Sequence, residues 1–189
     1  MKLGEKPLRN RKPIYVLDAT AIIYFAKISK LNLILETCDP HITREVYLET
    51  VERNGKYPES AIIKDTINRG QLKMYDVRER GHVEALLRHP EIHAGEAETL
   101  IAAKELGGLA VIDEKEARTV AKIYGIKTAP GTLFLLFRLL KLRKISVDNA
   151  DETLDNLIAS GLYLDSKTLL RAKKRLKEYK PKNKANQSV

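Results

Sequence analysis

The stretch that decides the fold is Ile14–Ala26, which reads IYVLDATAIIYFA. Its first four residues are apolar or aromatic, which is typical of a buried β-strand, and the strand is expected to end at Asp18. Beyond Thr20 the apolar residues resume over a helical length. A carboxylate at the carboxyl end of a buried strand, directly before a helix, lies where open α/β sheets bind their ligands. Asp18 or Thr20 could instead simply cap the helix, because both residue types are good N-caps.

Strand-like and helix-like segments alternate along the rest of the chain. Leu109–Ile112 is a second apolar strand, and it ends at Asp113. Shorter strands are expected at 41–42, 72–77 and 126–128. Helices are expected at 31–37, after Thr43, at 58–68, 83–88, 93–106, 114–124 and 131–142. This alternation predicts an α/β fold with a parallel sheet of four to five strands, flanked by helices on both faces.

Length and composition exclude several classes of protein. The chain has 189 residues, of which 43% are hydrophobic, so it is long and apolar enough to bury a sizeable core. A single cysteine, Cys38, cannot form an internal disulfide, which fits a reducing compartment. No signal peptide is recognisable, and Arg138 and Lys141 interrupt the apolar run 133–142. We therefore expect a soluble, cytoplasmic protein.

The charge is distributed unevenly along the chain. The net charge is +9, but residues 1–13 carry +4 and residues 166–189 carry +8, which leaves −3 for 14–165. Basic ends on an acidic body suggest a polyanionic partner, or else ends that only keep the protein soluble. We expect a basic N-terminal arm (1–13), a sheet domain (14–145), a helical hairpin (146–178) and a basic disordered tail (179–189).

The predicted hairpin consists of two amphipathic helices, 149–159 and 166–177, joined at Ser160-Gly161. Such a pair could be a helix-turn-helix that reads nucleic acid with its basic second helix. It could also be an αα-hairpin that packs on the sheet domain, which is the favoured interpretation. For nucleic-acid binding, the candidates on the second helix are Arg171, Lys173, Lys174, Arg175 and Lys177.

Carboxylates are the strongest chemical signal in the sequence. Asp18 and Asp113 each end an apolar strand, so a parallel sheet would bring both to one edge, where Glu49, Glu96 or Glu98 could join them from helices. Clustered carboxylates raise one another's proton affinity, and therefore usually imply a bound metal ion. Oxygen ligands suit Mg²⁺ or Mn²⁺, and the sequence has no Cys/His spacing typical of structural zinc. A Mg²⁺ site on a protein with basic ends indicates phosphodiester hydrolysis.

Each of these acids also has a purely structural interpretation. Asp113 and Glu116 have the spacing of a capping box. Glu96 near a helix N-terminus interacts favourably with the helix dipole. Glu49 could be a solvent-facing helix residue. The helix that carries Glu96 and Glu98 is apolar on nearly every side, so its periodicity does not choose between them.

Four segments in order resemble the motifs of PIN-domain nucleases, a family that includes the toxins of VapBC systems. VLDATAII resembles the first motif, with Asp18 and Thr20. ITREVYLE resembles the second and aligns Glu49, rather than Glu45, with its acid. ETLIAAKEL places Glu98 at the third acidic position, and VIDEKEAR places Asp113 at the fourth, with Glu114 or Glu116 nearby. The resemblance covers residues 14–142. Gly-Glu-Ala-Glu and Gly131-Thr132 look most like an archaeal subgroup of predicted nucleases.

The resemblance implies a PIN-like α/β/α sheet and a divalent-metal-dependent endoribonuclease. Asp18, Glu49, Glu98 and Asp113 would hold Mg²⁺ or Mn²⁺, with Glu96 as a further candidate ligand. Thr20 would orient a metal-bound water or a phosphate oxygen. RNA would be the substrate, and a VapBC-type toxin role, a small antitoxin partner and a homodimer are family-based expectations.

Three other functions compete with this interpretation. The chain could be a PIN-fold RNA-binding or regulatory module without turnover. A phosphatase with an aspartate nucleophile is disfavoured, because such enzymes need a second acid where this chain has Thr20. A dinucleotide-binding role has no Gly-x-Gly-x-x-Gly to support it.

Overall fold

The computed structural model describes residues 12–180. Its centre is β1 (Ile14–Leu17), in an all-parallel sheet of five strands with the order β3-β2-β1-β4-β5. The other strands are β2 (Asp39–Thr43), β3 (Lys73–Tyr75), β4 (Leu109–Ile112) and β5 (Thr128–Pro130). The predicted α/β class is confirmed. The predictions for the basic arm (1–13) and the tail (179–189) lie almost entirely outside the described residues.

Side chains of the two central strands alternate between two hydrophobic clusters, one on each face of the sheet. Leu17 and Val111 belong to the first cluster, whereas Val16 and Ile112 belong to the second, and all four are fully buried. Successive side chains of a strand point to opposite faces, so strands covered on both faces must be apolar throughout. This is why these two continuously apolar strands form the centre of the sheet.

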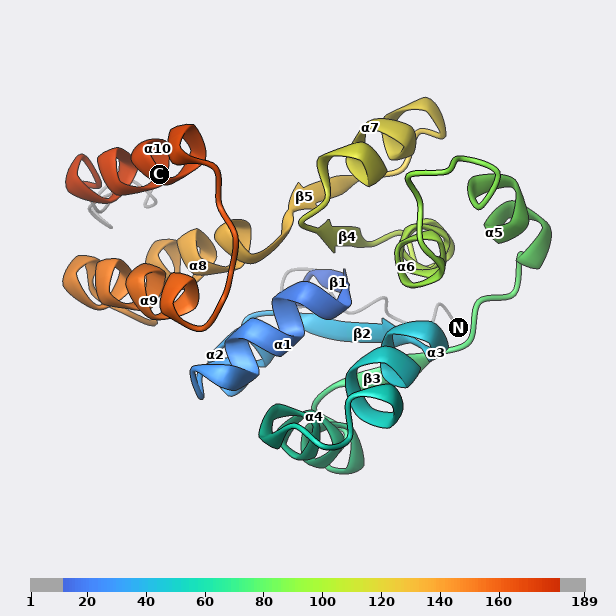
Figure 1. Cartoon of the computed structure of the whole chain (residues 1–189), viewed down its shortest axis with the longest axis horizontal. Coiled ribbons are helices and arrows are strands. Elements are labelled where there is room, and N and C mark those ends of the chain that lie inside the picture. The colour runs from blue at the N-terminus through green and yellow to red at the C-terminus, as the bar shows by residue number, and fades with distance from the viewer. Residues whose placement is uncertain (1–11, 181–189) are drawn as a thin grey trace, which may run out of the picture.

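The helices form a layer on each face (Figure 1). Those that supply the first cluster are α1 (Ala19–Lys27), α2 (Leu31–Leu35), α4 (Pro58–Asn68) and α8 (Gly131–Lys141). Those that supply the second are α5 (Arg80–Leu86), α6 (Ala94–Glu105) and α7 (Lys115–Ile123). Among the described residues, no helix combines the length and the apolar character needed to cross a bilayer.

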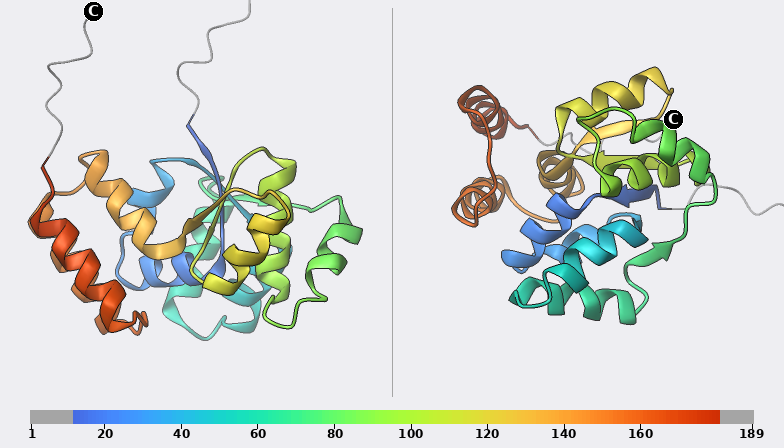
Figure 2. Two further views of the ribbon diagram at one scale, coloured as in Figure 1. Left: turned by 90° about the horizontal axis from the view of Figure 1, so that it is seen from above. Right: turned by 45° about the vertical axis from the view of Figure 1, so that its right-hand side comes forward.

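The C-terminal hairpin consists of α9 (Val147–Ala159) and α10 (Ser166–Lys177), and it packs on α8 (Figure 2). Leu154 and Leu157 of α9 and Leu176 of α10 are buried in the first hydrophobic cluster. The amphipathic faces seen in the sequence therefore serve packing against the sheet layer. The hairpin extends the core that α8 shares with α1.

Several elements differ from the sequence-based expectation. The helix expected at 83–88 is α5 at Arg80–Leu86, and the strand expected at 72–77 is β3 at Lys73–Tyr75. The strand expected at 126–128 begins at Thr128, because the Ile126 amide donates to the Ala121 carbonyl and closes the turn after α7. The short strand expected at 41–42 is longer, and Asp39 is its first residue. The helix after Thr43 is α-helical only over α3 (Arg44–Tyr47), and then continues as a π-helix, η1 (Leu48–Arg53). Single π-turns occur frequently at functional sites.

Candidate active site

The carboxyl ends of β1 and β4 meet at the point where the strand order reverses. From β1 the chain runs outward through β2 and β3, and it then returns to place β4 on the other side of β1. Ligands of open α/β sheets bind in the crevice at such a switch point. Asp18 and Asp113 directly follow these two strands, and the Asp18 amide donates to the Val111 carbonyl at 3.1 Å. The predicted meeting of the two strand ends is thus present.

Asp18 occupies the N-cap position of α1, but its side chain makes no capping hydrogen bond. Only 6% of the residue is exposed. The pKa of Asp18 is raised to about 7, first by burial and then by the charges of Glu96, Glu49 and Asp113, while the Ala19 amide opposes this shift. Helix capping therefore does not account for this carboxylate, which is a member of an acidic cluster.

Asp113 is held by the first turn of α8. The Thr132 hydroxyl donates to Asp113 Oδ2 at 2.7 Å, and the Thr132 amide donates to Oδ1 at 2.9 Å and Oδ2 at 3.0 Å. Burial raises the pKa of Asp113, although these bonds and the charge of Arg118 oppose the shift. The N-cap of α7 is Glu114, so the proposed capping box of Asp113 with Glu116 is not formed.

Gly131 makes this contact between Asp113 and α8 possible. Its φ is +35°, and a Cβ placed on it would overlap the Asp113 carboxyl group. Only glycine leaves room for a carboxylate this close to the backbone.

Glu96 belongs to the acidic cluster as well as to the helix start. Its Oε2 accepts a hydrogen bond from the His93 amide at 2.9 Å, so the structural role at the N-terminus of α6 is real. Its Oε1 is buried without a hydrogen-bond partner. Burial raises the pKa of Glu96, and so do the charges of Glu114 and Glu49, whereas the His93 amide and ring lower it. One oxygen of Glu96 is therefore left for a ligand.

Glu98 makes different contacts from Glu96. Its Oε2 accepts a hydrogen bond from the Glu45 amide at 3.0 Å, and its Oε1 forms an ion pair with Arg80. Glu98 is not among the charges that raise the pKa of Asp18. The structure thus places Glu96 in the cluster, whereas Glu98 joins α6 to α3 and to α5. The assignment of Glu98 as a metal ligand stays a prediction, with both of its oxygens already partnered.

Glu49 and Thr20 complete the set of predicted residues. Glu49 is half-buried at the start of η1, and its charge raises the pKa of Asp18. A Cβ on Gly95 would lie 3.4 Å from Glu49 Oε2 and 3.8 Å from Asp18 Oδ1, so both carboxylates lie close to this glycine. Glu49 is therefore not simply solvent-facing. Thr20 is half-buried in the first turn of α1.

The donor set fits a hard divalent cation. Asp18, Glu49, Glu96 and Asp113 supply carboxylate oxygens only, which suit Mg²⁺ or Mn²⁺. The unpartnered Oε1 of Glu96 and the raised pKa of Asp18 are what uncompensated carboxylates show without a neutralising cation. As the side chains stand in residues 12–180, no group of three or more His, Cys, Asp or Glu residues is positioned to hold an ion.

Sequence reasoning missed the residues that position Asp113 from outside its own strand. Gly131-Thr132 entered only through a family resemblance, and Arg118 did not enter at all. Arg118 donates from Nη1 to the Ile112 carbonyl at 2.9 Å and to the Asp113 carbonyl. Gly131-Thr132 directly follows β5, the neighbour of β4, and this position could have indicated a contact with Asp113. The sequence alone does not give the order of the strands, so the contact could not be inferred from it.

The five basic candidates on α10 have different surroundings. Lys173 forms ion pairs with Asp151 at 2.9 Å and with Asp155 at 2.6 Å, which hold α10 to α9. The Arg175 guanidinium lies 4.1 Å from the centroid of the Phe137 ring. Lys174 lies 3.7 Å from Glu178, and Arg171 and Lys177 are exposed.

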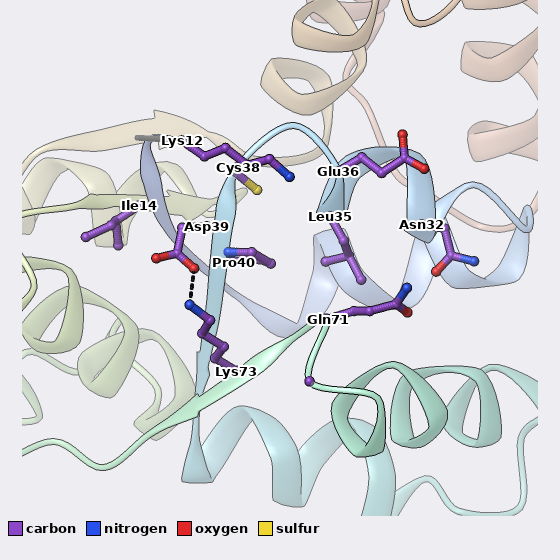
Figure 3. Close-up of a pocket in the computed structure, with 11 residues that line it drawn as sticks. Lys12, Ile14, Asn32, Leu35, Glu36, Cys38, Asp39, Pro40, Gln71 and Lys73 are labelled. Atoms are coloured by element: carbon purple, nitrogen blue, oxygen red, sulfur yellow. Dashed lines mark ion pairs between the residues drawn. The ribbon is translucent and has the colours of Figure 1, made fainter. Parts of the chain in front are cut away.

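A hollow of about 680 Å³ lies at the amino ends of the strands, opposite the acidic cluster (Figure 3). It is lined by the residues that begin three strands, Ile14, Asp39 and Lys73. Its one ion pair drawn in the figure joins Lys73 Nζ to Asp39 Oδ1 at 2.7 Å. Since a compensated pair replaces the clustered acids here, this edge offers no counterpart to the acidic cluster.

A doubly covered parallel sheet with carboxylates at its switch point defines an α/β protein with a candidate ligand site at that point. Comparison with family models identifies the family: the PIN-domain model matches residues 14–178, and the chain belongs to the PIN-domain family. The match extends beyond the four motifs and includes the hairpin of α9 and α10. Among curated proteins, no match was found.

Proposed function

We propose that this protein is a divalent-metal-dependent endoribonuclease. The observation that carries the proposal is the buried cluster around Asp18, whose pKa is raised to about 7 among Glu49, Glu96 and Asp113. Acids clustered without a cationic partner favour a cation site, and the position of this cluster at the switch point of the sheet supports that assignment.

Each residue of the cluster has a role in this proposal. Asp18, Asp113, Glu49 and Glu96 would hold Mg²⁺ or Mn²⁺, which when bound neutralises phosphate charge and lowers the pKa of an attacking water. Thr132 keeps the Asp113 carboxylate in one orientation through its hydroxyl and amide. Thr20, two residues after Asp18, presents a hydroxyl that can donate to a phosphate oxygen or orient a water.

Finer points of the proposal rest on the family resemblance and on charge. RNA as substrate is supported by the net charge of +9 and by the family's activity. A VapBC-type toxin role, a small antitoxin partner, a homodimer and a cytoplasmic location are expectations of the same kind. An antitoxin reading frame beside the gene would support the toxin role.

Removal of divalent ions tests the proposal directly. The purified protein is expected to cleave a generic single-stranded RNA in millimolar Mg²⁺ or Mn²⁺, and excess EDTA should lower the rate by at least about 100-fold. Gel analysis of the products gives the rate, and calorimetry gives ion binding. RNA binding without cleavage and without ion binding would instead identify a PIN-fold binding or regulatory module.

A pair of substitutions on α6 separates Glu96 from Glu98. Glu96→Gln should weaken Mg²⁺ binding and cleavage by about 10- to 100-fold, because it removes a charge from the cluster. Glu98→Gln should leave Mg²⁺ affinity nearly unchanged, but should lower the free energy of unfolding by about 1–2 kcal/mol, since Arg80 is half exposed. Loss of Mg²⁺ binding in the Glu98 variant alone would show that the motif alignment identified the ligand correctly.

A further inference from the structure

A second hollow of about 680 Å³ lies beside α8 and α10, at the β5 edge of the sheet. We call it the α8–α10 groove. Its charged lining residues, within the described part of the chain, are five cations and no carboxylates: Arg118, Arg138, Lys141, Arg171 and Arg175. Aromatic rings of Tyr15, Phe134 and Phe137 also line it. A concave surface of this composition attracts a polyanion with flat groups.

Two cations of the groove are stacked on aromatic rings. Across residues 12–180, none of the five forms an ion pair with a carboxylate. Arg175 lies over Phe137, and the Arg138 guanidinium lies 4.9 Å from the centroid of the Tyr15 ring. Arg138 Nε is buried without a hydrogen-bond partner. The positive charge of the groove is therefore uncompensated.

One end of the groove adjoins the acidic cluster. Arg118 lines the groove and donates to the Asp113 carbonyl, while Pro130 and Leu133 flank the Gly131-Thr132 pair that holds the Asp113 carboxylate. From there the groove follows α8 as far as Lys141, a length of about 16 Å at 1.5 Å per residue. A chain that leaves the acidic cluster along α8 would meet these cations in succession.

We propose that the α8–α10 groove binds the single-stranded segment of the RNA substrate that adjoins the cleaved bond. This inference rests on the proposed function, because continuity with the acidic cluster is what favours a substrate strand over an acidic peptide. The volume is that of a small-ligand pocket, which suits a few nucleotides of one strand better than a duplex. Guanidinium planes and the half-buried Phe134 ring provide surfaces on which bases stack.

The groove also divides the basic residues of α10 by role. Arg171 and Arg175 line it, whereas Lys173 is held by Asp151 and Asp155 of α9. Contact with RNA is thus assigned to one face of α10 together with Lys141 of α8, not to the whole basic helix.

The test measures binding of a fluorescein-labelled, single-stranded RNA by anisotropy in EDTA over a range of KCl concentrations. The double variant Arg171→Ala/Lys141→Ala removes two exposed cations of the groove. The matched control, Lys64→Ala/Lys122→Ala, removes two exposed cations from α4 and α7 outside it. Two lost phosphate contacts should weaken binding by about tenfold and reduce the slope of log K against log salt by about 1.4, with little change in the control.

Three results would overturn the proposal. These are an unchanged slope in the groove variant, equal losses in both double variants, or a groove variant that loses affinity for polyglutamate but not for RNA. A protein whose groove variant behaves as expected but that never cleaves RNA would retain the groove and lose the nuclease assignment. If the protein cleaves RNA normally but the groove variant binds RNA as tightly as the wild type, the nuclease assignment stands and the groove proposal is wrong.

Discussion

Asp18→Asn is expected to lower Mg²⁺-dependent RNA cleavage by at least about 100-fold while leaving the fold intact. Asp18 is the carboxylate at the centre of the cluster, and its pKa responds to Glu96, Glu49 and Asp113 together. Losing its charge removes several kcal/mol of electrostatic stabilisation from a bound cation, and each 1.36 kcal/mol is a factor of ten in rate. Asp76→Asn, at an exposed position, is the control. Cleavage by the Asp18 variant at the wild-type rate would refute the assignment.

The same variant should change how stability depends on pH. The pKa of Asp18 is about 7 in the folded protein, above its ordinary value of 3.8, so the unfolded chain loses this proton at lower pH than the folded one. The contribution of Asp18 to stability is therefore fully present below about pH 4, and it is lost as the pH rises through about 7.

Urea unfolding of the ion-free protein measures this effect. Asp18→Asn and wild type should have similar free energies of unfolding near pH 4, with the variant more stable near pH 8 by up to roughly 4 kcal/mol. Mg²⁺ should stabilise the wild type at the higher pH much more than the variant. A variant less stable than the wild type near pH 8 would mean that Asp18 is structurally compensated, contrary to the electrostatic argument.

Gly131→Ala is the second substitution with a large expected effect. The new Cβ would overlap the Asp113 carboxyl group, so this side chain must leave its hydrogen bonds with Thr132. We expect a loss of about 3 kcal/mol in the free energy of unfolding, made up of backbone strain at φ +35° and overpacking. Cleavage should fall by at least about tenfold, since the displaced carboxylate belongs to the cluster.

Gly125→Ala supplies the matched control for Gly131→Ala. Gly125 also has a positive φ, +66°, but a Cβ there would have no neighbour within 4 Å. It should lose only about 1 kcal/mol from backbone strain and should cleave normally. Should the Gly131 variant fail to fold, Thr132→Val removes the hydroxyl bond alone and should still reduce cleavage. Equal behaviour of both alanine variants, together with full activity of Thr132→Val, would contradict the role given to this contact.

The sheet and the two aspartates were predictable because their signals are local. Leu17 and Ile112 end apolar runs that only a doubly covered strand can bury, and an aspartate follows each of them directly. Parallel strands place their carboxyl ends at one edge, so the meeting of Asp18 and Asp113 required only the alternation of strands and helices.

The different surroundings of Glu96 and Glu98 were not predictable, for a physical reason. Nine successive residues of α6, 95–103, are buried, so the pattern of polar and apolar residues does not show which face of the helix points to the acidic cluster. The Glu98 carboxylate forms an ion pair with Arg80 and accepts a hydrogen bond from the Glu45 amide, and both partners are distant in sequence. The same holds for Lys173, whose charge looked free in the sequence but is matched by two aspartates of the preceding helix.

The insertion of β4 beside β1 has a consequence during translation. Tyr15 pairs with Leu109, and the Asp113 carboxylate is held by Thr132, so the residues of the acidic centre are synthesised far apart in time. A nascent chain that has emerged only as far as α6 has Asp18 without Asp113. On the proposed function, such a chain has an incomplete catalytic centre while the ribosome is still reading its own messenger. The order of synthesis would thus delay the assembly of the catalytic centre until β4 and α8 have emerged.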